Sequence, residues 1–134
     1  MTGEPRPKIV AIDDDSAALG LARAFLTSQG WSVSTAQDGQ SGLDQVRSVK
    51  PDIILLDINL PDMDGFAVCA KLKEDASLRD IPIVFISGAR KEAEDILKGL
   101  DPSRGDAFII KPVHLSVLKA KLEAVLRPGG ADCP

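Results

Sequence analysis

Short, unbroken apolar runs alternate along the chain with segments that carry apolar residues at helical spacing, and this alternation limits the possible folds. Apolar runs of this length, bounded by turn residues, are typical of buried strands. The strand-like segments are residues 9–12, 31–36, 53–56, 81–86 and 108–110, and the helical patterns cover 16–30, 38–50, 65–76, 91–100 and 114–126. Continuous Ile, Val and Leu runs suit a parallel sheet with both faces covered. We therefore expect an α/β fold with an open, doubly wound sheet.

The length of 134 residues fits one domain that buries its own core. We expect 1–7 to be a disordered lead-in, 8–127 to be the domain, and the Pro- and Gly-rich 128–134 to be a flexible tail or a truncated linker. The net charge of −4 argues against direct nucleic-acid binding, which needs a basic surface. The chain shows neither a signal-like start nor an apolar run of about 18 residues, so we expect a cytoplasmic protein without membrane contact.

The cysteines and the histidine offer no chemistry of their own. Cys69 and Cys133 lack the spacing of a metal site. Cys69 lies among apolar residues and is expected in the core, whereas Cys133 falls in the tail. His114, the only histidine, begins the last helical segment, where we expect a surface residue rather than a phosphodonor.

Polar side chains stand where four of the five expected strands end. The first strand runs into the acidic triplet 13–15, the third into Asp57, the fourth into Ser87 and the fifth into Lys111. Parallel strands place these carboxyl ends along one edge, where open α/β sheets bind their ligands. The sequence thus predicts carboxylates, a hydroxyl and an ammonium group around one crevice.

Each of these residues also has a purely structural interpretation. An acid that follows a strand is commonly the N-cap of the next helix. Asp15 or Ser16 fits this description, and Asp62 or Asp64 fits it for the helix after Asp57. Singly, each polar strand end is more often structural than chemical, but four together favour a site.

The carboxylates need either a proton on one of them or a cation between them. Two like charges about 4 Å apart repel by roughly 4 kcal/mol at an effective dielectric constant near 20. Lys111 supplies one positive charge, and a few carboxylates with waters suit Mg²⁺ better than a full Ca²⁺ cage. Support for an EF-hand at "DMDG" is weak because the loop lacks the remaining ligands and the glutamate at its twelfth position. Between Mg²⁺ and Lys111, Asp57 is placed to act as a nucleophile that forms an acyl phosphate.

At this point the residues resemble the receiver domain of two-component response regulators. The resemblance covers Lys8 to about Leu126 and is carried by "IVAIDDD", "IILLDINLPDMDG", "IPIVFISGA" and "FIIKP", in that order. It implies a CheY-like, flavodoxin-like (βα)5 fold with the strand order 2-1-3-4-5.

The resemblance also implies a role for each site residue. Asp57 matches the phosphoacceptor. The acidic pair that holds Mg²⁺ corresponds to Asp13 and Asp14, with Asp14 the more direct ligand, and Asn59 matches the position whose backbone carbonyl completes the metal shell. The remaining matches are Ser87 for the hydroxyl that turns toward the phosphoryl group, Lys111 for the salt-bridge lysine, Pro112 for the residue that follows a cis bond, and Phe108 for the aromatic switch position.

Two features bear on how such a switch works. Phe108 has no hydroxyl, so an inward state is expected even without phosphate, and plain core packing explains the residue equally well. The segment 100–106 departs from the common family pattern by an extra residue, a proline and an arginine, which affects partner choice rather than chemistry. Ala89 and Asn59 flank the site at positions that tune phosphate lifetime. The turn after Asp57 is expected to leave this carboxylate exposed to a phosphodonor.

The leading hypothesis is a phosphorylation-dependent signalling switch rather than a turnover enzyme. Asp57 would accept a phosphoryl group from a phosphohistidine and change the surface formed by the fourth helix, fifth strand and fifth helix. One alternative is a small Mg²⁺-dependent phosphotransfer enzyme, but Asn59 stands where such a phosphatase carries its second acid. The other is a receiver-like interaction module that is not phosphorylated.

The expected partners follow from the leading hypothesis. They are a sensor histidine kinase or a histidine phosphotransfer protein, and then a downstream protein or a fused output domain. A homodimer is possible. The sequence fits equally a protein that consists of this domain alone and a longer protein of which this domain is a part.

Overall fold

The computed structural model describes residues 7–88 and 107–126. In this part of the chain, five parallel strands form one sheet in the order β2-β1-β3-β4-β5. The strands are β1 (Lys8–Ile12), β2 (Ser32–Ala36), β3 (Ile53–Asp57), β4 (Ile83–Ser87) and β5 (Ala107–Ile110), and the helices are α1 (Ser16–Ser28), α2 (Gly39–Val49), α3 (Gly65–Lys73) and α5 (Leu115–Leu126). The expected α/β fold and strand order are confirmed.

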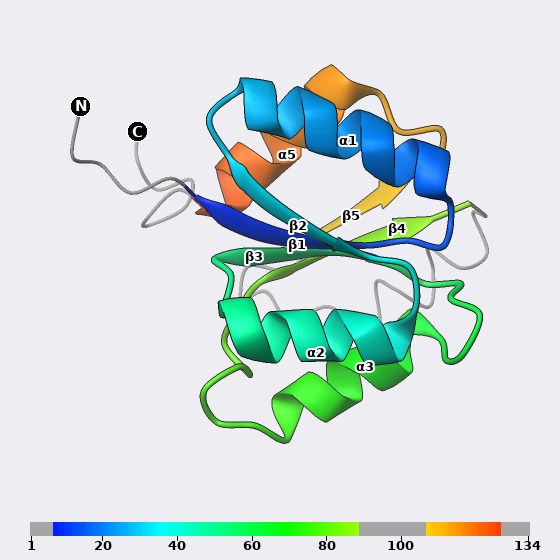
Figure 1. Cartoon of the computed structure of the whole chain (residues 1–134), viewed down its shortest axis with the longest axis vertical. Coiled ribbons are helices and arrows are strands. Elements are labelled where there is room, and N and C mark those ends of the chain that lie inside the picture. Colours follow the sequence, from blue (N-terminus) through cyan, green and yellow to red (C-terminus); the bar gives the residue numbers. More distant parts are fainter. Residues whose placement is uncertain (1–6, 89–106, 127–134) are drawn as a thin grey trace.

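Helices cover both faces of the sheet, with α1 and α5 on one face and α2 and α3 on the other (Figure 1). Alternate residues of each inner strand enter opposite layers. Ile54 and Leu56 of β3 join the core under α2 and α3, whereas Ile53 and Leu55 join the core under α1 and α5. All of β3 and β4 is buried, which explains why their sequences are apolar up to the terminal Asp57 and Ser87.

The N-cap of α1 is Asp15, one of the two candidates. Its carboxylate accepts hydrogen bonds from the N–H groups of Ala17 and Ala18 at 3.0 and 3.1 Å. These bonds satisfy donors that the helix cannot pair internally. Asp15 therefore has a structural task at the edge of the site.

The N-cap of α3 is Asp64, whose carboxylate accepts from the Ala67 N–H at 2.8 Å. The other candidate, Asp62, caps a different helix. It binds the N–H groups of Gly39 and Gln40 at the start of α2. The prediction that Asp62 or Asp64 caps α3 is therefore confirmed through Asp64, whereas the partners of Asp62 lie 22 and 23 residues away along the chain.

Some expected boundaries shift. β4 begins at Ile83 rather than at residue 81, because the Ile81 N–H donates to Leu78 O in a turn. Cys69 is buried in the core, as predicted, and His114 is exposed immediately before α5. The expected helix 91–100, the loop 100–106, Ala89, Cys133, the tail 128–134 and the lead-in before Pro7 lie outside the described residues. Within the described ranges, no helix is long and apolar enough to cross a membrane.

Candidate functional site

The carboxyl ends of the strands gather the polar residues at one edge of the sheet. Asp13 directly follows β1, and Asp57 is the last residue of β3, which pairs with β1. Ser87 ends β4 on the other side of β3, and Lys111 directly follows β5. The backbone N–H of Lys111 donates to the backbone carbonyl oxygen of Ser87 at 2.8 Å, and this hydrogen bond holds the two strand ends together. The predicted juxtaposition is therefore present in the structure.

Three carboxylates meet at this edge. One oxygen from each of Asp13, Asp14 and Asp57 lies within 4.8 Å of the others. Asp13 and Asp57 are only 5% and 2% exposed, whereas Asp14 is exposed. At such separations like charges repel by roughly 4 kcal/mol per pair at an effective dielectric constant near 20. The cluster consequently favours a proton or a cation.

Lys111 provides part of the compensating charge. Its Nζ donates a 2.9 Å hydrogen bond to Asp57 Oδ2 and lies 3.8 Å from Asp13 Oδ2. Partial burial by itself would lower the pKa of Lys111, but the hydrogen bond to Asp57 and the charge of Asp13 outweigh it and raise the pKa. Lys111 therefore remains an ammonium group at neutral pH.

Lys111 does not compensate both buried carboxylates, and the pKa of Asp13 shows the effect. Burial is the largest cause that raises the pKa of this carboxyl group, from 3.8 to about 6, and the neighbouring Asp57 adds to it. The Asp15 N–H, which donates to Asp13 Oδ1 at 3.0 Å, and the charge of Lys111 oppose the rise. A hard cation beside Asp13 would stabilise its ionised form, which Lys111 alone does not fully compensate.

Both oxygens of Asp57 are held in place. Oδ1 accepts from the Asn59 N–H at 2.8 Å, and Oδ2 accepts from Lys111. These contacts leave the residue only 2% exposed. The expectation that Asp57 is exposed was wrong, because the ammonium group and the loop after β3 cover it.

The other predicted residues lie close by. Ser87 is fully buried at the end of β4. Phe108 is half-buried in β5, in register with Phe85 of β4, and packs against the core under α2 and α3. The peptide bond between Lys111 and Pro112 is cis. These positions are compatible with the roles that the resemblance implies, which stay predictions.

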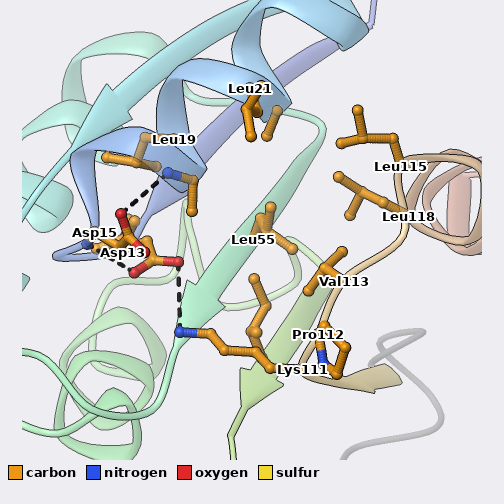
Figure 2. Close-up of a pocket in the computed structure, with 14 residues that line it drawn as sticks. Asp13, Asp15, Leu19, Leu21, Leu55, Lys111, Pro112, Val113, Leu115 and Leu118 are labelled. Atoms are coloured by element: carbon orange, nitrogen blue, oxygen red, sulfur yellow. Dashed lines mark hydrogen bonds and ion pairs between the residues drawn. The ribbon is translucent and has the colours of Figure 1, made fainter.

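A cavity of about 270 Å³ adjoins the acidic cluster, on the side of the sheet that α1 and α5 cover. Figure 2 shows Asp13 and Lys111 at one end of it and leucines of α1 and α5 along its walls. Leu21 of α1 lines the cavity and is 65% exposed. Sequence patterns do not reveal this cavity, because its walls come from helices far apart in the chain.

The residues of the cluster fit a magnesium ion. Mg²⁺ prefers oxygen ligands and is usually held by one or two carboxylates together with water and phosphate oxygens. The cluster offers three carboxylates, one of them exposed to solvent. The soft thiolate or imidazole ligands that favour zinc or copper are absent from this cluster.

Comparison with known proteins identifies the family. The sequence profile described as "Response regulator receiver domain" matches residues 9–123. The chain belongs to the response regulator receiver domain family. Asp13, Asp14, Asp57, Ser87 and Lys111 all fall within the matched segment of this receiver domain.

Curated relatives support the assignment. The receiver domain is 40% identical over 123 residues to the transcriptional regulatory protein AfsQ1 of Streptomyces coelicolor, covering 92% of this chain and 52% of AfsQ1. It is 41% identical over 120 residues to the response regulator PleD of Caulobacter vibrioides, covering 90% of this chain and 26% of PleD. The chain thus spans about half the length of AfsQ1 and about a quarter of PleD.

Solved structures agree with the fold. A two-component response regulator from Clostridium difficile superimposes with a TM-score of 0.81 at 33% identity, covering 94% of this chain and all of that one. The chemotaxis response regulator CheY4 of Vibrio cholerae gives a TM-score of 0.80 at 25% identity, with 91% of this chain and all of that one covered. The chain is therefore a receiver domain of the two-component type, a class of signalling switches.

Proposed function

We propose that this receiver domain accepts a phosphoryl group from a phosphohistidine onto Asp57 and that Mg²⁺ assists the transfer. The observation that supports this most directly is the meeting of three carboxylates and an ammonium group at one sheet edge. An Asp57 oxygen attacks phosphorus, the phosphorus–nitrogen bond of the donor breaks, and the donor imidazole leaves with a proton. The product is an acyl phosphate on Asp57.

Each neighbouring residue has a task in this proposal. Asp13, Asp14, Asp57 and the backbone carbonyl of Asn59 would hold Mg²⁺, which would neutralise charge on the transferring group. Lys111 orients Asp57 before transfer and pairs with a phosphoryl oxygen afterwards. The hydroxyl of Ser87, at the end of the neighbouring strand, would donate a hydrogen bond to another phosphoryl oxygen.

The output proposal concerns β5 and the helices beside it. Phosphorylation adds charge and three acceptor oxygens at Asp57. An inward turn of Ser87 would leave space that Phe108 of the adjacent strand can fill. The surface of the segment between β4 and β5, of β5 and of α5 would then change. Ile110 of β5 and Val117 of α5 are 42% and 48% exposed, so this surface already carries apolar side chains.

The partners are proposed from the same chemistry. A histidine kinase or histidine phosphotransfer protein would supply the phosphoryl group. The output would be a protein contact, in trans or with a fused domain, because AfsQ1 is a transcriptional regulatory protein of which this chain matches about half. The net charge of −4 favours protein contact over direct DNA contact by this segment. A homodimer of the phosphorylated form is one way to present the changed surface.

A labelling experiment tests the proposal. With Mg²⁺ and a small acyl phosphate, the mass of the wild-type protein should increase by one phosphoryl group, and Asp57→Ala should stay unlabelled. Asp44→Ala is the control, because Asp44 is an exposed acid of α2 outside the cluster. Equal labelling of the wild type and Asp57→Ala would show that the proposal is wrong.

The same assay separates the alternatives. Continuous turnover of phosphate esters would indicate a phosphotransfer enzyme, and Mg²⁺ binding without labelling would indicate an interaction module. For the switch, a titration with a phosphate mimic should move the chemical shifts around Phe108. Unchanged shifts there would contradict the coupling between Asp57 and β5. Oligomer mass with and without the mimic tests the homodimer.

A further inference from the structure

We infer that Asp62 is a positioning residue, which fixes the loop after β3 so that the backbone of this loop orients Asp57. Asp62 lies in the turn between β3 and α3, and its carboxylate binds the start of α2. Oδ1 accepts from the Gly39 N–H at 2.7 Å and Oδ2 accepts from the Gln40 N–H at 2.9 Å. This inference rests on the proposed function, since it assigns a task in holding the proposed acceptor.

The N-terminus of α2 needs this carboxylate. The N-cap Asp38 binds only the Ser41 N–H through its side chain, at 2.7 Å, and its carbonyl accepts from the Gly42 N–H. The first two N–H groups of the helix have no partner within it. Asp62 supplies both acceptors, and its negative charge is favourable at the positive end of the helix. These two hydrogen bonds also lower the pKa of the Asp62 carboxyl group.

The two segments meet at very short range. A Cβ atom at Gly39 would lie 2.4 Å from Met63 Cγ and 3.2 Å from Asp62 Oδ1. A side chain at Gly39 would therefore force the Met63 side chain to move and would crowd the Asp62 carboxylate, so the glycine permits this close approach. The contact is a close junction between α2 and the loop after β3, although the Asp62 side chain itself is exposed.

The other side of the same loop closes against β3. The Gly65 N–H donates to Ile58 O at 2.7 Å, and a Cβ atom at Gly65 would lie 2.9 Å from Asp57 O. Asn59 and Asp64 form an antiparallel bridge across the loop. The turn is thus closed at its base and anchored at its tip by Asp62.

The loop after β3 also contacts Asp57, the proposed phosphoacceptor. The Asn59 N–H, which lies at the base of the loop, donates to Asp57 Oδ1 at 2.8 Å. If the tip is released from α2, the base gains freedom and the Asn59 N–H no longer holds Asp57 in one orientation. Asp62 therefore acts on Asp57 through Asn59, without touching the carboxylate cluster.

The test compares two caps of one helix. Asp62→Ala removes the anchor, Asp62→Asn keeps one of the two acceptors, and Asp38→Ala removes the cap that does not touch the loop. We expect Asp62→Ala to weaken Mg²⁺ binding by about tenfold, as loss of an outer-shell support usually does, and Asp62→Asn to weaken it less. Asp38→Ala should lower the thermal midpoint similarly but keep the dissociation constant for Mg²⁺ within about twofold of the wild type.

Amide chemical shifts give a second measurement. The Asn59 amide signal should move or broaden in Asp62→Ala and stay in place in Asp38→Ala. Calorimetry of Mg²⁺ binding is done well below the midpoint of each variant, so that all the protein is folded. If the two alanine variants show the same Mg²⁺ affinity and the same Asn59 signal, the inference is wrong. Neither measurement requires phosphorylation. If the wild-type protein took up no phosphoryl group in the labelling experiment, the proposed function would be wrong, but the Mg²⁺ and chemical-shift measurements would still test the role of Asp62.

Discussion

The ammonium group of Lys111 donates a 2.9 Å hydrogen bond to Asp57, although 54 residues separate them in the chain. The pair closes the gap between β3 and β5, two strands that do not pair with each other. The same ammonium group lies 3.8 Å from Asp13. One ammonium group thus lies beside two buried carboxylates. When both carboxylates are ionised, one negative charge is left without a positive partner, and the predictions below follow from this imbalance.

Replacement of Lys111 by methionine should destabilise the protein when Mg²⁺ is absent. The substitution keeps the apolar stem and leaves Asp13 and Asp57 without their ammonium partner. We expect the free energy of unfolding at pH 7 to fall by about 1–3 kcal/mol, less than for a fully buried pair because Lys111 is partly exposed. Urea unfolding with and without Mg²⁺ measures this change.

Lys119→Met is the matched control for that substitution. The Lys119 side chain is 34% exposed, close to the 35% of Lys111, but its acidic partner Glu123 is half exposed and 4.0 Å away, and its other partner, Gln29, is neutral. The control should change the free energy of unfolding by less than about 0.5 kcal/mol. Equal losses in both variants would contradict the importance of the buried carboxylates.

Stability without metal should fall as the pH rises toward neutrality, through the contribution of Asp13. Its pKa is raised by burial from 3.8 to about 6 in the folded protein. A group with a raised pKa stabilises the fold fully below its unfolded pKa, and this stability is lost as the pH rises through the folded pKa. Asp13→Asn should therefore exceed the wild type in free energy of unfolding at pH 7, by at most about 3 kcal/mol, and by less near pH 4.

Denaturant unfolding of both proteins in the presence of a chelator, at several pH values, measures the difference. Asparagine keeps an oxygen that can accept from the Asp15 N–H, so the substitution tests charge rather than the loss of that hydrogen bond. A difference that does not vary between pH 4 and pH 7 would contradict the burial of an ionised Asp13.

Mg²⁺ affinity should weaken as the pH falls through about 6, where Asp13 gains a proton. A carboxylate must be ionised to bind the metal, so proton and Mg²⁺ compete. We expect the dissociation constant at pH 5 to be about tenfold higher than at pH 7.5, as measured by calorimetry. Asp13→Asn should bind weakly at both pH values, and a wild-type affinity that is equal at both would contradict Asp13 as a ligand.

Replacement of Ser87 by alanine should slow phosphoryl uptake and leave the protein folded. Ser87 is fully buried at the end of β4, beside Asp57 of β3. A hydrogen bond to a charged group contributes about 1.5–3 kcal/mol, so we expect the rate of labelling to fall by about tenfold or more. Ser77→Ala is the control, since Ser77 is exposed and its hydroxyl donates to Asp75 at 2.7 Å, outside the cluster. Equal labelling rates for the two variants would contradict a role for the Ser87 hydroxyl.

The sequence by itself determined the layers of the fold and the composition of the site. Continuous apolar runs specify strands that are buried on both faces, and the parallel arrangement puts every strand end at one edge, so Asp13, Asp57, Ser87 and Lys111 had to meet there. Local signals of this kind depend only on neighbours within a few positions, which is why the cap Asp15 was also among the residues predicted.

Only the tertiary structure decided how the gathered groups share charge and contacts. Lys111 binds Asp57, and burial raises the pKa of Asp13, results that depend on distances of a few ångströms between strand ends. Asp62 caps α2 instead of α3 because the turn docks against Gly39, more than twenty residues away. Burial, electrostatics and docking are sums over residues that are remote in sequence, so periodicity and spacing along the chain cannot specify them.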